Sequence, residues 1–212
     1  MINTGCEELD TFLGGGFDGG VIYLIYGPAA SGKTTICLQT SLNNSKDGKI
    51  LYIDTEGGFS VDRVKQMSEE YEAHLKNIVV LRIKNFEDQI KYFKNLNEVM
   101  KIGKFNLLII DSLSIHYRKA LQEENYKEVN DELINILRSL KHIAEDCNIP
   151  VIITNQIYSN MQGENVLVGG NMLKKFGKMI IELKTKPRIA KIIKPEESVF
   201  HFKIEDNGIK KL

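Results

Sequence analysis

A glycine-rich stretch near the N-terminus constrains the fold most strongly. Residues 27–35 read GPAASGKTT and follow the apolar run VIYLIY at residues 21–26. Residues 27–34 match the pattern G-x-x-x-x-G-K-[ST], which binds phosphates where it joins a strand to a helix. Glycines in such a loop let backbone N–H groups turn toward the phosphates, and the N-terminus of the helix adds a favourable dipole. The pattern therefore predicts a phosphate loop, our name for residues 27–35, on an α/β scaffold.

Individual residues of the phosphate loop have expected roles. Lys33 is expected to reach the β- and γ-phosphates, and the Thr34 hydroxyl to bind Mg²⁺. A glycine turn that merely starts a helix is the alternative, and the strand-like run in front of the loop argues against it. The predicted nucleotide-binding residues are Gly27, Pro28, Ala29, Ala30, Ser31, Gly32, Lys33, Thr34 and Thr35.

Short apolar runs rich in β-branched residues alternate with longer helical patterns. The runs cover residues 21–26, 50–54, 78–83, 107–111 and 151–155, and the longest helical pattern covers residues 126–147. This alternation predicts a mostly parallel, twisted sheet with flanking helices. Residues 159–171 read as a loop. Because no helical pattern separates them, three further runs at residues 179–183, 189–193 and 199–204 predict an antiparallel C-terminal extension.

The first residues predict a short helix. Thr4 and Glu7 have the spacing of a capping box, so we expect the helix to start after Thr4. Residues 14–16 are all glycine, which should end it.

Composition narrows the class of protein. The 212 residues fit a single domain at residues 1–212, and 28 Lys and Arg balance 28 Asp and Glu, so no overall field favours nucleic acid or membrane. Residues 170–212 are nevertheless basic, with 11 Lys and Arg against 5 Asp and Glu. Cys6, Cys37 and Cys147 are odd in number and widely spaced, which favours reduced thiols. Without a signal segment or a run near the roughly 20 apolar residues that span a bilayer, we expect a cytoplasmic protein.

Three polar residues after predicted strands complete the expected site. Asp111 ends the run LLIID, at the sheet edge where it would bind Mg²⁺, partly through water. Glu56, in YIDTEGG, is the candidate to orient or deprotonate the attacking water, and Asp54 is the competing acid. Gln156, in ITNQ, is placed to touch a γ-phosphate and pass its presence to the next loop. Alternatively, both acids cap a loop and Gln156 bonds only to backbone.

In combination these motifs resemble the RecA superfamily, and within it the archaeal and eukaryotic recombinases. The resemblance implies a RecA-like P-loop ATPase core that binds ATP and Mg²⁺, a role in homologous recombination and DNA repair, and Glu56 as the catalytic carboxylate. It also implies that Arg63 packs on the adenine, although Arg63 equally fits a solvated helix position. The matching stretches, in the family's order, are TGCEELDTFLGGGF, GPAASGKTT, YIDTEGGFSVDRV, LLIIDSLSIHYR and VIITNQ.

The chain departs from these recombinases in two places. They carry a helical DNA-binding domain before the core, whereas residues 1–3 alone precede the matching stretch here, so we expect no such N-terminal domain. The loop after Gln156, which binds single-stranded DNA in the family, has no aromatic residue at positions 159–175. Because stacking on aromatic side chains is worth roughly 1 to 3 kcal/mol per base, we expect mainly electrostatic binding. These features favour an accessory factor that acts on single-stranded DNA or on a RadA-type recombinase, with homo-oligomers possible, over a self-sufficient strand exchanger.

Two sets of basic residues are candidates for these contacts, and each also fits ordinary solvated surface. By this resemblance the DNA candidates are Arg118 and Lys119, in the first DNA-facing loop of the family, and Lys174 and Lys175, after the second such loop. A second set resembles cations that family members insert into a neighbouring subunit's ATP site, although a basic strand edge also discourages aggregation. This set places Lys184, Lys186 and Arg188 at alternate positions of a strand edge and adds Lys194.

Three functions fit this sequence. The first is a slow Mg²⁺-dependent ATPase of recombination, coupled through Gln156 to a DNA loop. The second is a binding module that holds ATP as a conformational ligand with negligible turnover. The third is a KaiC-like signalling ATPase, which shares TGCEELD and the phosphate loop. A small-molecule kinase is disfavoured because no Arg-rich lid insertion separates the predicted core strands.

Overall fold

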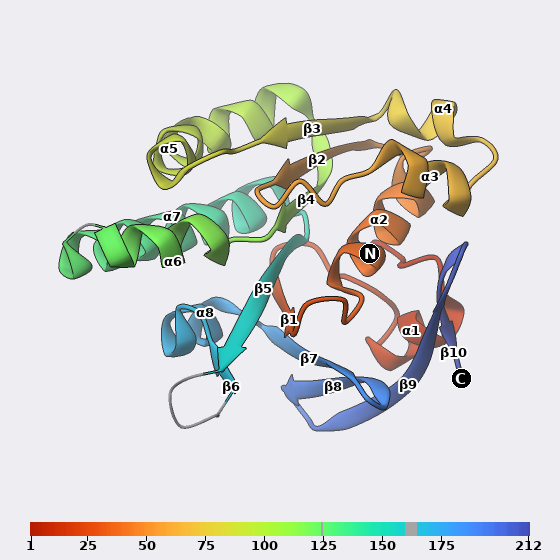
Figure 1. Cartoon of the computed structure of the whole chain (residues 1–212). Helices are drawn as coiled ribbons and strands as arrows, with labels where there is room; N and C mark the ends of the chain where they lie inside the picture. The colour runs from red at the N-terminus through yellow and green to blue at the C-terminus, as the bar shows by residue number, and fades with distance from the viewer. Residues whose placement is uncertain (124, 160–164) are drawn as a thin grey trace.

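The strands of the computed structural model, which describes residues 1–123, 125–159 and 165–212, form one ten-stranded sheet (Figure 1). Its order is β10-β9-β8-β7-β1-β5-β4-β2-β3, with β6 paired to β5. The strands are β1 (Ile22–Gly27), β2 (Lys49–Asp54), β3 (Ile78–Arg82), β4 (Phe105–Asp111), β5 (Val151–Ser159), β6 (Asn165–Leu167), β7 (Met179–Thr185), β8 (Arg188–Lys194), β9 (Ser198–Glu205) and β10 (Gly208–Lys211). The helices are α1 (Glu7–Phe12), α2 (Lys33–Asn44), α3 (Val61–Met67), α4 (Tyr71–Leu75), α5 (Phe86–Gly103), α6 (Ser114–Glu123), α7 (Tyr126–Cys147) and α8 (Gly170–Phe176).

The direction of the strands confirms a mostly parallel sheet with an antiparallel C-terminal extension. Neighbours are parallel from β3 through β2, β4, β5 and β1 to β7, and antiparallel from β7 to β10. The three predicted runs, β7 to β9, are antiparallel to one another as expected, and β7 also joins the parallel core through β1. Helix α8 crosses from the β5–β6 hairpin to β7, which lets β7 pair with β1 in parallel. Reading residues 159–171 as a loop missed β6 and the start of α8; residues 160–164 lie outside the described part.

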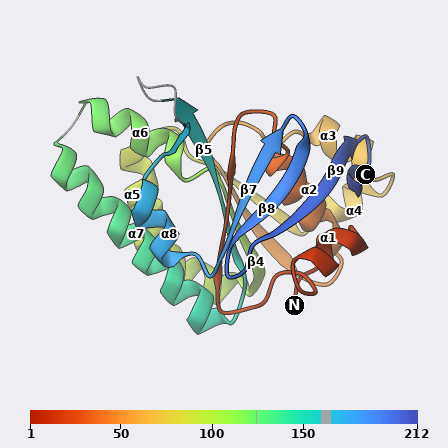
Figure 2. The ribbon, with the colours of Figure 1, turned by 90° about the horizontal axis from the view of Figure 1, so that it is seen from below.

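Helices cover both faces of the sheet (Figures 1 and 2). Helices α5 to α8 pack on one face, and α1 to α4 pack on the other. Helix α7 has the bounds that its periodicity predicts, because its buried side chains recur every three or four residues and form one apolar stripe. These side chains are Val129, Leu133, Ile136, Leu137, Leu140, Ile143 and Ala144.

The start of helix α1 differs from the capping-box prediction, which is wrong. The helix begins at Glu7, with Cys6 as its N-cap residue. Gly5 has a φ of +83°, which is not helical, and the Thr4 hydroxyl accepts a hydrogen bond from the Cys6 N–H at 3.1 Å. Thr4 therefore closes a turn in front of the helix, while the glycine triplet follows the helix end as expected.

The cysteines are reduced, as their number and spacing predict. Cys6, Cys37 and Cys147 are free thiols, the first two of them buried. Within the described ranges, every helix is too short or too polar to cross a bilayer.

The strand registers align the expected site residues along one edge of the sheet. Gly27, at the end of β1, is the partner of Gln156 in β5. Asp54, at the end of β2, is the partner of Asp111 at the end of β4. In open α/β sheets, ligands bind outside this carboxyl edge.

Candidate nucleotide-binding site

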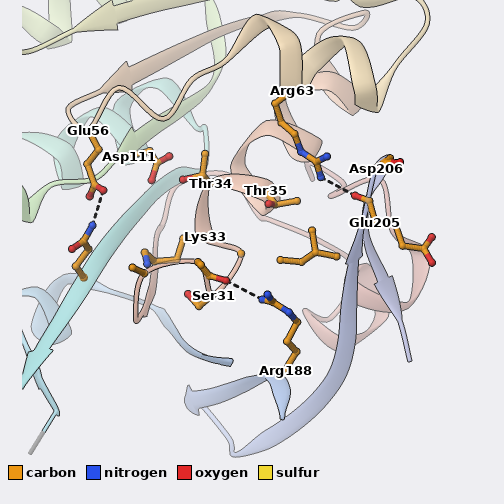
Figure 3. A pocket seen from close by; sticks show the side chains of 15 residues that line it. Ser31, Lys33, Thr34, Thr35, Glu56, Arg63, Asp111, Arg188, Glu205 and Asp206 are labelled. Carbon is orange, nitrogen blue, oxygen red and sulfur yellow. Dashed lines mark hydrogen bonds between the residues drawn. The ribbon is translucent and has the colours of Figure 1, made fainter. Parts of the chain in front are cut away.

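A cleft of about 570 Å³ lies at the carboxyl edge of the sheet (Figure 3). Residues 29–35 of the phosphate loop line it, together with residues from six other places in the chain. The expected site residues in its wall are Glu56, Arg63, Asp111, Gln156 and Arg188, and the β9–β10 hairpin adds Ile204, Glu205 and Asp206. The fold therefore brings most of the predicted site into one cavity.

The phosphate loop connects β1 to α2 and requires glycine at positions 27 and 32. A Cβ atom on Gly27 would lie 2.5 Å from the Leu183 carbonyl oxygen of β7, which is too close. Gly32 has a φ of +108°, a conformation that side chains rarely adopt. Glycine at position 27 lets the loop pass close to β7, and glycine at position 32 lets the backbone turn into α2.

Lys33 and Ser31 show that the loop fits a phosphate. The Lys33 Nζ donates to the carbonyl oxygens of Gly27 at 3.0 Å and Pro28 at 2.8 Å. Burial lowers the pKa of Lys33, and the neighbouring Glu56 and Asp111 carboxylates act in the opposite direction. The buried Ser31 hydroxyl has no hydrogen-bond partner in the described part of the chain. Because such an unpaired buried group is costly, an anion in the loop would supply a missing partner.

Thr34 and Asp111 face a common space that fits Mg²⁺. The Asp111 carboxylate is buried and accepts hydrogen bonds from the Tyr52 hydroxyl at 2.7 Å and the Thr154 hydroxyl at 2.5 Å. A Cβ atom on Gly58 would lie 3.6 Å from the Thr34 hydroxyl and 3.8 Å from an Asp111 oxygen. Hydroxyl and carboxylate oxygens are the ligands that Mg²⁺ prefers. Gly58 thus borders the space that the Thr34 hydroxyl and the Asp111 carboxylate share.

The two competing acids have different environments. The Asp54 carboxylate is buried and accepts four backbone hydrogen bonds, from the N–H groups of residues 56, 57, 58 and 59. Asp54 therefore shapes the loop after β2. Glu56 lines the cleft, where it accepts hydrogen bonds from the Ser112 hydroxyl and from the Gln156 side-chain amide, the latter at 2.6 Å. The geometry favours Glu56 over Asp54 as the acid that faces a ligand.

Gln156 links this acid to the next strand. Its amide bonds to Glu56, so the alternative that it bonds only to backbone is wrong. The residue lies on β5, which continues into the hairpin with β6. Gln156 therefore lies on the strand that connects the cleft to this hairpin.

Arg63 closes the end of the cleft that lies opposite Glu56 (Figure 3). Its guanidinium donates to the Glu205 carbonyl oxygen at 2.7 Å and to the Gln66 side chain at 3.0 Å. It therefore joins α3 to the β9–β10 hairpin. Sequence reasoning missed the hairpin residues of the cleft; the turn-forming residues Asp206, Asn207 and Gly208 could have indicated a hairpin, but not its contact with α3.

The DNA candidates lie outside the cleft. Arg118 and Lys119 lie in helix α6, so the expectation of a loop there is wrong: residues 114–123 are helical. The Arg118 guanidinium lies 4.7 Å from the centre of the Tyr158 ring. Lys174 and Lys175 lie in the last turn of α8, as expected after the second loop.

The second basic set is not arranged as expected. Lys184 lies on β7 and Arg188 on β8, with Lys186 in the turn between them, so they do not share one strand edge. The Lys194 Nζ donates to the Gly177 carbonyl oxygen at 2.8 Å, at the end of α8. Arg188 donates to the Ala30 carbonyl oxygen at 2.9 Å, in the phosphate loop of its own chain.

A phosphate loop, a buried strand-end aspartate and a bridged glutamate on this sheet define a RecA-like nucleotide-binding core. The chain belongs to the Rad51 family, whose model matches residues 1–211. It is similar to a solved structure described as the RadB recombinase, with a TM-score of 0.82, 33% identity and 100% of both chains covered. The DNA repair and recombination proteins RadB of Thermococcus sibiricus and Thermococcus kodakarensis are 36% and 37% identical to it, over 99% of this chain and 94% and 98% of theirs.

Proposed function

We propose that this chain is an ATP-binding accessory protein of homologous recombination and DNA repair. It hydrolyses ATP slowly with Mg²⁺, and it acts on single-stranded DNA or modulates a recombinase. The observation that supports this best is the 2.6 Å hydrogen bond between Gln156 and Glu56 in a cleft that also contains Lys33. It joins the acid that faces the ligand to the strand that leads away from it. The printed names of the RadB relatives point to the same process.

The proposed mechanism assigns one task to each residue. Backbone N–H groups of the phosphate loop and Lys33 bind the phosphates. Thr34 and Asp111 hold Mg²⁺, which when bound supplies positive charge against the phosphate oxygens. Glu56, oriented by Ser112 and Gln156, positions the attacking water and accepts its proton on a carboxylate oxygen.

Gln156 couples the state of the nucleotide to the β5–β6 hairpin in this mechanism. Its amide donates to Glu56 here, and a γ-phosphate oxygen would compete for the same donor. An exchange of partners would shift the end of β5 and the β5–β6 hairpin, which lies beside α8 in Figure 1. The state of the nucleotide would thus reach the segment that carries Lys174 and Lys175.

The family match bears on the alternatives. Membership of the Rad51 family does not favour a KaiC-like signalling ATPase. A binding module with negligible turnover has the same cleft and differs only in catalysis, so the loss of turnover on changing Glu56 separates it from the proposed enzyme.

Single-stranded DNA binding tests the recombination part of the proposal. We expect an oligonucleotide to bind with an affinity that falls as salt rises. If Arg118 and Lys119 contact phosphates, changing both to Ala should reduce the slope of log K against log salt by about 1.4, because each contact to a single strand contributes about 0.7. Fluorescence anisotropy of a labelled oligonucleotide over a salt series measures this slope.

A matched control removes two charges elsewhere. Lys91 and Lys94 are exposed on α5, and changing both to Ala should leave the slope within error of the wild-type value. Equal losses of slope in the two double variants would show that α6 has no special role. No binding at any salt concentration would remove DNA from the proposal.

A further inference from the structure

Arg188 lies in the nucleotide cleft of its own chain. Its Nη1 donates to the carbonyl oxygen of Ala30 at 2.9 Å, although 158 residues separate the two in sequence. Figure 3 shows its side chain extending from the β8 end of the cleft to the phosphate loop. We propose that Arg188 is a positioning residue that holds the phosphate loop in its ATP-binding shape in cis. This inference rests on the proposed binding of ATP.

The atom that Arg188 holds controls the orientation of a peptide group in the loop. Ala30 has a φ of +58°, in the left-handed region that residues other than glycine rarely adopt. In a trans peptide the carbonyl and the next N–H point in opposite directions. With the Ala30 oxygen directed to Arg188, the Ser31 N–H points the other way, where it approaches the Pro28 carbonyl oxygen at 3.3 Å. The peptide group between Ala30 and Ser31 is therefore held from both sides, by Arg188 at its oxygen and by Pro28 at its N–H.

The sheet itself fixes the reach of Arg188. Strand β7 runs parallel to β1, and its Leu183 carbonyl contacts Gly27 at the start of the phosphate loop. The β7–β8 turn then returns the chain so that Arg188 pairs with Thr185. Arg188 is only partly exposed, whereas Lys186 in the turn is exposed. Delivery of this cation to the loop therefore needs no second subunit.

Charge adds to the positional effect. Arg188 lines the same cleft as Lys33, so its guanidinium also raises the local positive potential where phosphates would bind. Arg188→Lys keeps the charge and one donor with a different geometry, and Arg188→Gln keeps a donor without the charge. These two variants separate hydrogen bonding from electrostatics.

The first experiment measures the affinity for ATP and Mg²⁺ by displacement of a fluorescent ATP analogue. We expect Arg188→Ala to weaken binding about tenfold, since a hydrogen bond from a charged donor is lost, and Arg188→Lys to recover part of that loss. Lys191→Ala removes the same charge from the same strand, where Lys191 pairs with Glu197 at 2.9 Å, and should bind ATP like the wild type. Thermal midpoints without nucleotide show whether each variant is folded.

A mixing experiment then distinguishes cis from trans action. The Lys33→Ala protein retains Arg188 but lacks the lysine of the phosphate loop. The Arg188→Ala protein retains that lysine but lacks Arg188. We expect a mixture of the two to bind ATP no more tightly than Arg188→Ala protein alone, at every total concentration. Recovered affinity on mixing, or wild-type affinity of folded Arg188→Ala and Arg188→Lys proteins, would overturn the inference. Failure of the wild-type protein to bind ATP would instead contradict the proposed function, and the inference with it.

Discussion

Changing Glu56 to Gln is expected to lower ATP turnover by about 10²- to 10⁴-fold, the usual contribution of a general acid or base, while ATP still binds. The amide has the shape of the carboxylate but cannot accept the proton of the attacking water. Its oxygen can still accept from Gln156, and its NH₂ group can donate to the Ser112 hydroxyl, so the local bonds survive. Steady-state phosphate release and equilibrium ATP binding, measured on the same preparation, separate the two effects.

A control for the charge change uses an acid far from the cleft. Glu87 is exposed in the first turn of α5, and Glu87→Gln should turn over ATP at the wild-type rate. If Glu56→Gln also kept the wild-type rate, Glu56 would not be the catalytic carboxylate. If the wild-type protein bound ATP without measurable turnover, the binding-module alternative would hold.

Changing Lys33 to Ala is expected to weaken ATP binding by about 10- to 150-fold, the equivalent of a lost hydrogen bond to a charged group. The ammonium of Lys33 contacts the Gly27 and Pro28 carbonyl oxygens of the phosphate loop, whereas the Arg188 guanidinium contacts the loop at Ala30. Saturating ATP should raise the unfolding free energy of the wild-type protein by roughly 2.7 kcal/mol at a hundred times the dissociation constant. At the same ATP concentration, about half or more of this ligand-dependent stabilisation should disappear in Lys33→Ala, as measured by thermal unfolding with and without ATP.

Lys33 also donates to two carbonyl oxygens of the loop, so its loss can destabilise the protein without any ligand. The first control is therefore the thermal unfolding of Lys33→Ala without nucleotide. Lys46→Ala provides the second: this exposed lysine follows helix α2 and pairs with Glu70 at the surface, where an ion pair contributes little. It should keep the full ATP-dependent shift. An undiminished shift in Lys33→Ala would show that ATP binds elsewhere.

The parallel core and the phosphate loop could be predicted because their signals are local. Apolar runs and the 126–147 periodicity lie within single elements, and Lys33 and Thr34 belong to one short motif. Helix α8 was missed because its sequence, GNMLKKF, is short, begins with glycine and follows a second glycine, Gly169. Without α8, the parallel pairing of β7 with β1 could not be predicted.

Parts of the site depend on contacts between distant segments, which no local pattern encodes. The choice between Asp54 and Glu56 became clear only when the four backbone hydrogen bonds to Asp54 were seen. Arg188 was expected to serve a neighbouring subunit because of its family resemblance, and its contact with Ala30 follows from the position of β8 in the sheet. The closure of the cleft by the β9–β10 hairpin likewise depends on a contact between distant segments, Arg63 on α3 and Glu205 on β9.

The affinity for single-stranded DNA in different nucleotide states tests the coupling through Gln156 most directly. It is measured by anisotropy with ATP, with ADP and without nucleotide, in Glu56→Gln protein, which should keep ATP intact. We expect the ATP-bound and nucleotide-free forms to differ at least about fivefold, the lower end of usual coupling between sites. Adding Gln156→Ala should abolish that difference while ATP still binds. Equal DNA affinity in all states of Glu56→Gln, with ATP shown to be bound, would contradict the coupling.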